Sequence, residues 1–426
     1  MCRSFARRGP TAPIVEADSS TPGFAVSPEA AFSLLEELAR ISDEPPGLTR
    51  TFLSPALDRA KSLVAGWMRA AGLEVFEDQA GNLIGRLDCG IPGAGTVACG
   101  SHLDTVRNAG RFDGAMGVVT ALLAVAAMAK SGRQLPFHLE VVGFSDEEGV
   151  RFQSTYLGSR FYAGTLGPGE RSSRDAEGIT VDEAIASHRP RFPAPPSRRL
   201  LGYVEAHIEQ GPVLEAANLP LGVVTSIAGQ TRARVFLEGK SGHAGTTPMN
   251  LRRDALAGAA EGIALVERAA ASADGLVATV GDLRIESAAS NVIPGRVNYT
   301  LDIRDADDLK RVGFCEKVFA EIEARAKSRG LEVRIDVPLI ASATPCAPRL
   351  TDALAAFVEK IQPVCPRLVS GAGHDAVALA EVTEVAMLFV RCREGLSHHP
   401  DEFATPEDIA LAVRVLTDFL TNYPIS

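Results

Sequence analysis

The alternation of apolar and polar positions predicts two helices and then strands in the first hundred residues. Residues 28–41 carry apolar side chains at helical spacing, and Ser27 with Pro28 forms a typical helix start. Residues 55–72 repeat this pattern and end on a glycine. The next segments are short and apolar, as strands are: LEVFEDQAGNLIGRL and GTVACGSHLD.

The middle of the first half predicts a sheet covered by a buried helix. The segment GAMGVVTALLAVAAMAKSG is apolar on nearly every face, which is typical of a helix packed inside a protein. FHLEVVGFSDEEG follows as an apolar strand that ends in three acidic residues. Strand, helix and strand in this order indicate an α/β sheet, whose ligand sites lie beyond the carboxyl ends of its strands.

From about residue 226 the pattern changes to alternating strands and amphipathic helices. The order is strand, helix, strand, a second helix over about 308–329, and the strand LEVRIDVPL. This order predicts a small α+β sandwich that is inserted into the larger domain.

These elements divide the chain into four segments. We expect a mobile leader at 1–24, a first part of the catalytic domain at 25–225, an inserted domain at 226–340 and the second catalytic part at 341–426. The predicted fold class is therefore α/β, with a mixed sheet in the catalytic domain and a smaller α+β sandwich beside it.

Composition narrows the class of function. A formal net charge of -10 over 426 residues gives no positive field that would attract nucleic acid or an anionic membrane. The seven cysteines are scattered without a CxxC pair, as in reduced intracellular proteins. The strongest apolar run, 118–129, is too short to cross a bilayer, and no secretory signal follows the basic N-terminus. We expect a cytoplasmic enzyme without nucleic-acid or membrane partners.

Residues 102–113 gather groups that bind metals. His102 and Asp104 stand two positions apart near a strand end, and Asp113 precedes the next helix. Imidazole nitrogen and carboxylate oxygen suit Zn²⁺ or Mn²⁺, and a second carboxylate commonly orients a ligating imidazole. The alternative is a hydrogen-bonded structural histidine, with Asp113 as the N-cap of the helix.

The acidic run at 146–148 strengthens the metal interpretation. Asp146, Glu147 and Glu148 follow a buried strand, where three negative charges repel each other unless positive charge is near. Neighbouring side chains of an extended segment point to opposite sides, so that one glutamate can bind metal while the other faces substrate as a base. The alternative is a solvated acidic loop.

Further histidines stand in motifs that are rich in glycine or acids. His207 is flanked by acids and by Gln210, and His398 with His399 lies near the C-terminus. Two histidines, a glutamate and a bridging carboxylate could hold two metal ions about 3.5 to 4 Å apart, a spacing that activates a water between them. The predicted reaction is hydrolysis of an amide-like bond.

The motifs resemble one known family as a set. They run in order from about residue 27 to the C-terminus: GSHLDT with GRFDG, DEEGVRF, EAHIEQGPVLE, GHAGTTPM with RRDA, SNVIPG, SGAGHDA and SHHPDEF. The set resembles the amidase branch of the dinuclear-metal aminoacylase and carboxypeptidase superfamily. That branch contains allantoate amidohydrolases, N-carbamoyl-L-amino acid hydrolases and β-ureidopropionases. The resemblance implies a metallopeptidase-like catalytic domain, an inserted domain that serves as a lid and dimerises, and two divalent ions per subunit.

The resemblance also implies roles for the metal-site residues. Asp113 would bridge the two ions, Glu147 would be the general base, and Asp104 would orient His102. The other ligands that it implies are His102, Glu148 and His207 for one ion, and His398 for the second. The family motif places its last ligand two residues before a proline, which selects His398 over His399. Mn²⁺, Zn²⁺ and Co²⁺ all fit this mixed donor set.

Substrate contacts are implied by the same resemblance. HIEQG marks the members that cleave ureido compounds, and it assigns a substrate contact to Gln210. The inserted domain of a homodimer would provide His243 to stabilise the oxyanion, and Asn291 with Arg304 to hold the substrate carboxylate. The planar fork of Arg304 suits a carboxylate, although an arginine beside two aspartates could simply be ion-paired on a sheet surface. A plain turn position is the alternative for His243, and polar packing beside the site is the preferred interpretation of His374.

The implied activity is hydrolysis of a linear ureido (N-carbamoyl) carboxylate with release of ammonia and carbon dioxide. FSDEEGVRFQSTYLGS most resembles allantoate amidohydrolases, so allantoate is the favoured substrate. N-carbamoyl-L-amino acids and β-ureidopropionate are the alternatives, because few pocket side chains separate them. A peptidase or aminoacylase would lack HIEQG, and a catalytically silent binding protein would have lost a ligand or Glu147.

Overall fold

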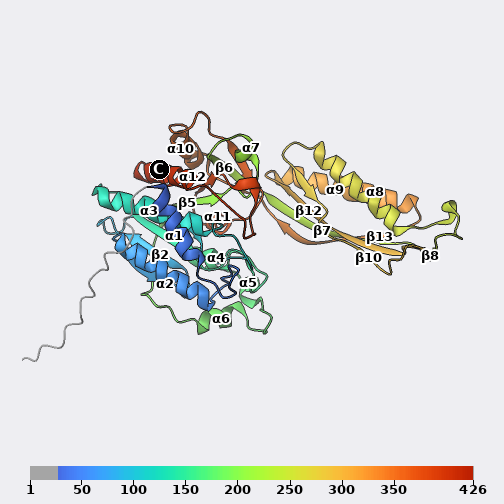
Figure 1. The fold of residues 1–426 in the computed structure, drawn as a ribbon, viewed down its shortest axis with the longest axis horizontal. Coiled ribbons are helices and arrows are strands. Elements are labelled where there is room, and N and C mark those ends of the chain that lie inside the picture. The colour runs from blue at the N-terminus through green and yellow to red at the C-terminus, as the bar shows by residue number, and fades with distance from the viewer. Residues whose placement is uncertain (1–26, 426) are drawn as a thin grey trace, which may run out of the picture.

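The computed structural model describes residues 27–425 and shows two lobes (Figure 1). The leader expected at 1–24 lies outside the described residues. The predicted first two helices are confirmed as α1 (Pro28–Ala39) and α2 (Pro55–Ala70). The side chain of Ser27 caps α1 by accepting a hydrogen bond from the amide of Ala30.

The larger lobe is built on a nine-stranded mixed sheet. The strand order is β1-β2-β4-β3-β5-β16-β6-β14, and β15 also pairs with β6. The inner strands β4, β3, β5 and β16 are parallel to one another, and β1 and β2 run antiparallel to their neighbours. Strand β6 is antiparallel to β16 and β14 and parallel to β15. The bounds are β1 (Glu74–Glu77), β2 (Leu83–Leu87), β3 (Thr96–His102), β4 (His138–Phe144), β5 (Leu200–Ile208), β6 (Leu221–Ile227), β14 (Thr344–Pro345), β15 (Arg367–Ser370) and β16 (Val385–Val390).

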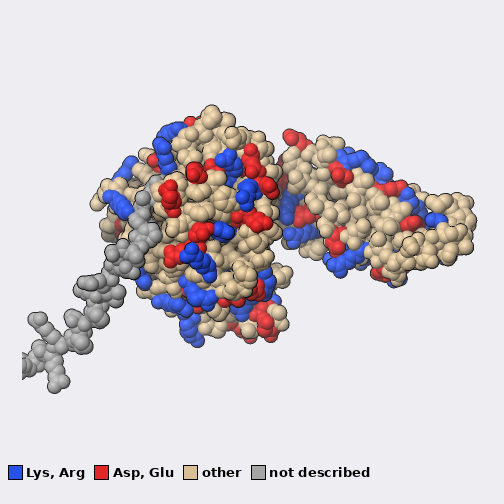
Figure 2. Space-filling model, viewed as in Figure 1, with Lys and Arg blue, Asp and Glu red and all other residues tan. Residues whose placement is uncertain are grey.

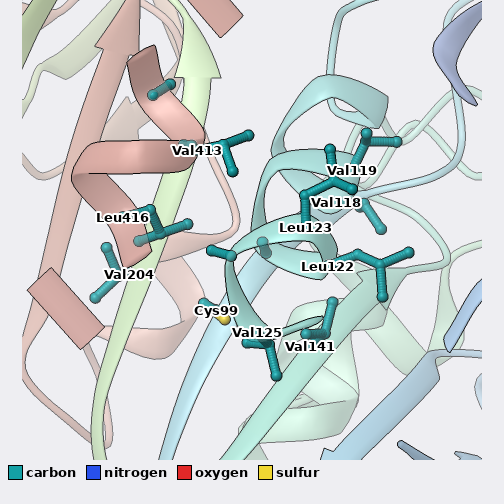
Figure 3. Close-up of a cluster of buried hydrophobic side chains, with 14 of the residues drawn as sticks. Cys99, Val118, Val119, Leu122, Leu123, Val125, Val141, Val204, Val413 and Leu416 are labelled. Atoms are coloured by element: carbon teal, nitrogen blue, oxygen red, sulfur yellow. The ribbon is translucent and has the colours of Figure 1, made fainter. Parts of the chain in front are cut away.

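One face of this sheet is covered by a helical layer around α3 (Ala115–Ser131). This helix packs on β3, β4 and β5 and is covered in turn by α1 and α12, which explains why it is apolar all round. Figure 3 shows Val118, Leu122 and Val125 of α3 in this core, with Val413 and Leu416 of α12. The other helices of the large lobe are α4 (Leu157–Ala163), α5 (Pro168–Ser172), α6 (Val181–Ser187), α7 (Val213–Ala216), α10 (Pro348–Val358), α11 (Ala376–Leu379), α12 (Pro406–Thr421) and the 3-10 turn η2 (Arg393–Gly395).

The second lobe is an antiparallel sheet with two helices on one face (Figure 1). Strands β7 and β12 alternate between buried and less buried positions, as the pattern predicts. Val235 and Tyr299 are partners on these neighbouring strands, and both lie in the core of this lobe. Its elements are β7 (Gly229–Glu238), β9 (Val277–Thr279), β10 (Leu283–Ile285), β12 (Arg296–Asp305), β13 (Glu332–Ala341), α8 (Ala255–Ala271) and α9 (Asp308–Ser328). The far tip carries β8 (Gly242–His243), β11 (Val292–Ile293) and the 3-10 turn η1 (Met249–Leu251). A mixed sheet with an additional antiparallel unit confirms the predicted fold class.

The parallel strands bring the polar motifs to one edge of the large sheet. His102 ends β3, the acidic run 146–148 follows β4, and His207 lies at the end of β5. Carboxyl ends of parallel strands share one edge, so that these groups converge although they are far apart in the chain.

Charged side chains of both signs are mixed on the surface (Figure 2). Figure 2 shows basic and acidic side chains interspersed over both lobes on the face drawn. Within residues 27–425, no helix is both long and apolar enough to cross a membrane.

Candidate active site

Two groups of potential metal ligands meet at Asp113. The first joins His102, Asp113 and His207, and the second joins Asp113, Glu148 and His398. Oδ1 of Asp113 lies 3.3 Å from Nε2 of both His102 and His207. Oδ2 of Asp113 lies 3.5 Å from Nε2 of His398, which is 3.4 Å from Oε1 of Glu148. The two oxygens of one carboxylate therefore face two separate ligand groups.

This grouping differs from the one that the resemblance implies. Glu148 was expected with His102 and His207, but its Oε1 lies nearest to His398. A further group of His102, Glu147 and Glu148 shows that the acidic run is close to both halves of the centre. His399 belongs to none of the ligand groups found within the described residues, and its Nδ1 accepts a hydrogen bond from the amide of Asp401.

The local structure does not support the alternative of Asp113 as the N-cap of the helix. The N-cap of α3 is Gly114, which makes no side-chain cap, and Asp113 lies one residue earlier. Gly114 has a φ of 64°, and a Cβ at this position would overlap the ring of His102. The turn that aims Asp113 at the histidines therefore requires a glycine.

Both buried histidines are held in the tautomer that binds metal through Nε2. Nδ1 of His102 lies 3.0 Å from the backbone carbonyl of Asp104, and Nδ1 of His207 lies 2.9 Å from the carbonyl of Ile208. A carbonyl only accepts, so each Nδ1 carries the proton and each Nε2 presents a lone pair to Asp113. A charge-assisted hydrogen bond would be about 2.7–2.9 Å long. The observed 3.3 Å instead matches the ligand-to-ligand edge of a tetrahedral ion with bonds of about 2.0–2.1 Å.

Asp104 lies at His102 and makes two further contacts that the sequence does not predict. Its carboxylate accepts hydrogen bonds from the backbone amides of Glu147 and Glu148, at 3.0 and 3.2 Å. Its Oδ1 is 3.5 Å from Nδ1 of His102. The same Nδ1 is hydrogen-bonded with the backbone carbonyl of Asp104. Asp104 thus fixes the acidic run against the strand that carries His102.

The acidic run is buried, which excludes the solvated-loop alternative. Asp146 is 1% exposed and Glu147 is 7% exposed. Burial raises the pKa of Glu148 to about 8, and the charge of Asp113 adds to the shift. Burial also raises the pKa of Glu147, although the charge of His102 opposes this. The cluster of carboxylates therefore lacks positive charge, which divalent cations at the two ligand groups would supply.

A second set of hydrogen bonds surrounds Asp113, and the sequence did not predict it. Glu402 accepts from the amides of Phe112 and Asp113, at 2.7 and 2.9 Å. The hydroxyl of Ser397 donates to Oδ2 of Asp113 at 2.5 Å, and Nε2 of Gln210 donates to the same oxygen at 2.7 Å. Gln210, expected to touch substrate, contacts the shared carboxylate here. The only sequence signal for Glu402 and Ser397 was their position in the SHHPDEF motif.

The ligand groups open into a crevice of about 1050 Å³ between the lobes. His102, Glu147 and His398 line it from the large lobe, and Arg232 and Arg304 line it from the second lobe. Tyr156 also lines it and was not predicted. Its backbone has a φ of 64° and its amide donates to the carbonyl of Glu147 at 3.1 Å. A substrate in this crevice would contact both lobes.

The three residues expected from the second lobe lie at its two ends. Arg304 lines the crevice, and its guanidinium is ion-paired with Asp302 through Nε at 2.8 Å and through Nη2 at 3.0 Å. His243 and Asn291 lie at the far tip, where the amide of Ala244 donates to the carbonyl of Asn291 (Figure 1). The eight steps along β12 from Arg304 to Arg296, toward the tip, already span roughly 25 Å. One small molecule cannot contact both ends of this lobe in one chain.

The neighbouring His374 is a packing residue, as expected. Its Nε2 is hydrogen-bonded with Ser370 at 2.7 Å, and its ring lies edge-on to His207 with centroids 4.5 Å apart. It belongs to none of the ligand groups found within residues 27–425.

Known proteins share both the sequence and the fold. Residues 98–422 match the model of peptidase family M20/M25/M40. An allantoate deiminase of Arabidopsis thaliana is 39% identical over 93% of this chain and 83% of its own. An N-carbamoyl-L-amino-acid amidohydrolase of Pseudomonas sp. (strain NS671) is 40% identical over 91% and 96%. The crystal structure of an amidase of the hydantoinase/carbamoylase family from Burkholderia multivorans superposes with a TM-score of 0.87 at 34% identity, covering 93% of this chain and 97% of the other. The chain therefore belongs to peptidase family M20/M25/M40 and is an amidohydrolase of that family.

Proposed function

We propose that this chain hydrolyses the linear ureido carboxylate allantoate and releases ammonia and carbon dioxide from one carbamoyl group. The observation that carries the proposal is the pair of ligand groups that share Asp113 at the bottom of an interlobe crevice, with Glu147 beside them. Relatives named for allantoate and for N-carbamoyl-L-amino acids support a ureido substrate.

The donor set fits two divalent cations, Mn²⁺ or Zn²⁺ with Co²⁺ as a further option. His102, Asp113 and His207 would hold one, and Asp113, Glu148 and His398 would hold the other. When bound, the ions supply Lewis-acid polarisation of the ureido carbonyl and lower the pKa of a nearby water.

Glu147 is the proposed general base. It lines the crevice beside His102, and Asp104 holds its backbone amide. Its carboxylate takes a proton from the attacking water while the water oxygen bonds to the ureido carbon. Glu147 then gives that proton to the leaving nitrogen as the carbon–nitrogen bond breaks. The carbamate fragment decomposes to ammonia and carbon dioxide, which balances one water consumed per carbamoyl group.

The substrate carboxylate is assigned to Arg304. Its guanidinium lines the crevice opposite Glu147, and a planar fork binds carboxylates in a bidentate manner. Gln210 would meet the ureido group from the side of Asp113. His243 and Asn291 can reach a site only in another chain, so a homodimer through the second lobe is part of the proposal. A cytoplasmic location without nucleic-acid or membrane partners completes it.

N-carbamoyl-L-amino acids and β-ureidopropionate are the alternative substrates. Relatives of the allantoate and carbamoyl kinds are 39% and 40% identical to this chain, so overall similarity does not separate them. All these compounds place a carboxylate near a ureido group, and one arrangement of Arg304 and Glu147 would serve each.

The test is ammonia release by protein reconstituted with Mn²⁺ or Zn²⁺, with allantoate, several N-carbamoyl-L-amino acids, β-ureidopropionate and one dipeptide compared at equal concentration. We expect the largest kcat/KM for allantoate. A larger value for a carbamoyl amino acid would move the assignment to the alternative. No turnover of any ureido compound by protein with metal bound would overturn the proposal.

A further inference from the structure

A separate cluster of metal-ligating side chains lies at the opposite edge of the large sheet. Asp88, Cys89 and His138 each place a possible ligand atom within 4.8 Å of the other two. His138 begins β4 and pairs with Thr96, whereas the catalytic edge is marked by the pair of His102 with Phe144. The six steps between these pairs correspond to roughly 20 Å along the strands. The cluster is therefore a different site from the candidate active site.

The ring of His138 faces Asp88 and Cys89 through Nδ1, whereas the active-site histidines face Asp113 through Nε2. Its Nδ1 lies 3.3 Å from Oδ2 of Asp88 and 3.2 Å from the backbone amide of Cys89, which donates to it. An Nδ1 that accepts from an amide has no proton, so its lone pair also faces a carboxylate oxygen. If Nδ1 were protonated toward Asp88, its hydrogen would face the amide hydrogen of Cys89. No single proton satisfies both contacts, so Nδ1 and the carboxylate oxygen meet without a hydrogen bond between them. A cation between these two atoms would take the Nδ1 lone pair in place of the Cys89 amide.

The spacing of this pair also equals that of the active-site pairs. The separations of His102 and His207 from Asp113 are 3.3 Å, as is that of His138 from Asp88. All three match the edge of a tetrahedral ion with bonds of about 2.0–2.1 Å.

The loop that follows β2 orients the carboxylate of Asp88 toward His138. Oδ1 of Asp88 accepts from the amide of Gly90 at 2.6 Å, which turns Oδ2 toward His138. Nε of Arg86 lies 3.7 Å from Oδ2, but another nitrogen of its guanidinium binds the buried Glu140 at 2.7 Å. The guanidinium of Arg86 is therefore held at the buried Glu140, and Oδ2 of Asp88 is directed at the ring of His138.

The cluster is open to solvent on one side. It borders a groove of about 570 Å³ that Asp88 and His138 line together with Glu74 and Arg86. Cys89 is a free cysteine of intermediate exposure. Three protein donors beside an open groove leave a fourth position for water, and the sulfur donor favours thiophilic ions such as Zn²⁺ and Co²⁺.

We propose that Asp88 Oδ2, Cys89 Sγ and His138 Nδ1 bind one thiophilic divalent cation of the Zn²⁺ class, with water as the fourth ligand. The thiol loses its proton to solvent as the metal–sulfur bond forms, and no group is oxidised. The bound ion joins the loop after β2 to the first residue of β4. This site does not depend on the hydrolytic activity proposed above.

Cobalt absorption tests the site, because a thiolate bound to Co²⁺ gives a charge-transfer band in the near ultraviolet. The active-site groups contain only nitrogen and oxygen donors, so they cannot produce that band. Metal-free full-length protein is titrated with Co²⁺, and wild type should show the band with more Co²⁺ bound per chain than Cys89→Ser. The Cys89→Ser variant should lose the band, and the matched control Cys2→Ser should keep it.

Two results would overturn the site: no band in wild type at saturating Co²⁺, or a band that persists in Cys89→Ser. The variant His138→Gln is a second test, because it removes the nitrogen ligand and retains the thiol of Cys89. Its thermal unfolding is measured in parallel because His138 is buried. The exposed Asp88→Asn variant, which is the least disturbing change, should shift the Co²⁺ titration to at least tenfold higher concentration. Absence of turnover would leave all these spectra unchanged, so that failure of the proposed function can be distinguished from failure of this site.

Discussion

Glu402 accepts a hydrogen bond of 2.9 Å from the backbone amide of Asp113, although 289 positions separate them in the chain. The same oxygen accepts from the amide of Phe112, and the other oxygen lies 3.0 Å from the hydroxyl of Ser397. Ser397 in turn donates to Asp113 and immediately precedes His398. One carboxylate thus positions the turn that carries the shared ligand and the segment that carries the last ligand.

Glu402→Ala should weaken metal binding and lower turnover at least tenfold. The variant leaves two buried amides without an acceptor, which costs about 1–3 kcal/mol for each group, and it frees the Asp113 turn. Glu402→Gln keeps a carbonyl oxygen for those amides and should retain most of both properties. Metal affinity is measured by titration of the metal-free protein and turnover by ammonia release.

The control for this change is Glu407→Ala, which removes an exposed glutamate from the start of α12. It should behave like wild type. If Glu402→Ala binds metal as tightly as Glu407→Ala does, Glu402 has no role in positioning Asp113.

Removal of metal should lower the thermal stability of the large lobe. Asp146 and Glu147 are buried beside Asp113, Glu148 is half-buried, and a bound cation would offset their mutual repulsion. A ligand present at a hundred times its Kd stabilises the folded state by about 2.7 kcal/mol per site. Scanning calorimetry with and without chelator should therefore show a lower Tm without metal, restored by Mn²⁺ or Zn²⁺. The Cys89→Ser variant must show the same loss, and an unchanged Tm in that variant would argue against cations at Asp113.

Arg304→Lys should raise KM for the ureido carboxylate about tenfold or more, with a smaller effect on kcat. Lysine keeps the charge but loses the planar guanidinium, which holds Asp302 through Nε and Nη2 and would present its remaining N–H groups to the substrate carboxylate. The matched control is Arg232→Lys, because Arg232 lines the same crevice and also contacts Asp302, at 3.3 Å. Equal effects of both changes on KM would mean that Arg304 only pairs with Asp302 on the sheet and does not bind the substrate carboxylate.

Acid should remove a specific part of the stability that Glu77 provides. Glu77 is bonded to Lys61 at 2.5 Å and to His188 at 3.0 Å, and all three side chains are nearly buried. Although burial opposes ionisation, the bond to His188 and the charge of Lys61 lower the pKa of Glu77 from 4.5 to about 2. A lowered folded-state pKa stabilises fully above about pH 4.5, and the effect disappears as the pH falls toward 2.

Glu77→Gln should therefore lower the free energy of unfolding by about 3 kcal/mol at pH 7 and by less at pH 3. Urea unfolding of wild type and Glu77→Gln is measured at each pH, and the change in free energy of unfolding is compared between the two pH values. Titratable groups that both proteins share cancel in this comparison. Glu74→Gln, an exposed change on the same strand, is the control. A difference that stayed constant between the two pH values would contradict the lowered pKa.

Much of the fold, and the convergence of several candidate ligands at one sheet edge, was predictable because it depends on local patterns. The apolar run before SDEEG and the helix after Asp113 fix a strand–helix–strand unit, and such units place strand ends at one edge. His102, Asp113 and His207 follow from that rule together with the motifs. The inserted sheet was likewise visible as alternation along β7 and β12.

The details that were missed depend on contacts between distant segments. The grouping of Glu148 with His398 is set by how a loop returns 250 residues later, and no periodicity encodes it. The carboxylate of Asp104 lies 3.5 Å from the His102 ring, but its hydrogen bonds to two backbone amides of the turn after β4 carry no sequence signal. Glu402 was missed for the same reason, because its partners are backbone groups that carry no sequence signal.

The most direct test of the central claim is ammonia release from allantoate by Glu147→Gln at verified metal loading. The variant replaces the proposed base by a group of the same size that cannot take a proton. It should bind the same number of metal ions as wild type and lose turnover by a factor of about 10² to 10⁴, whereas the exposed control Glu177→Gln should lose none. Wild-type turnover in metal-loaded Glu147→Gln would contradict the account of a shared Asp113 centre served by Glu147.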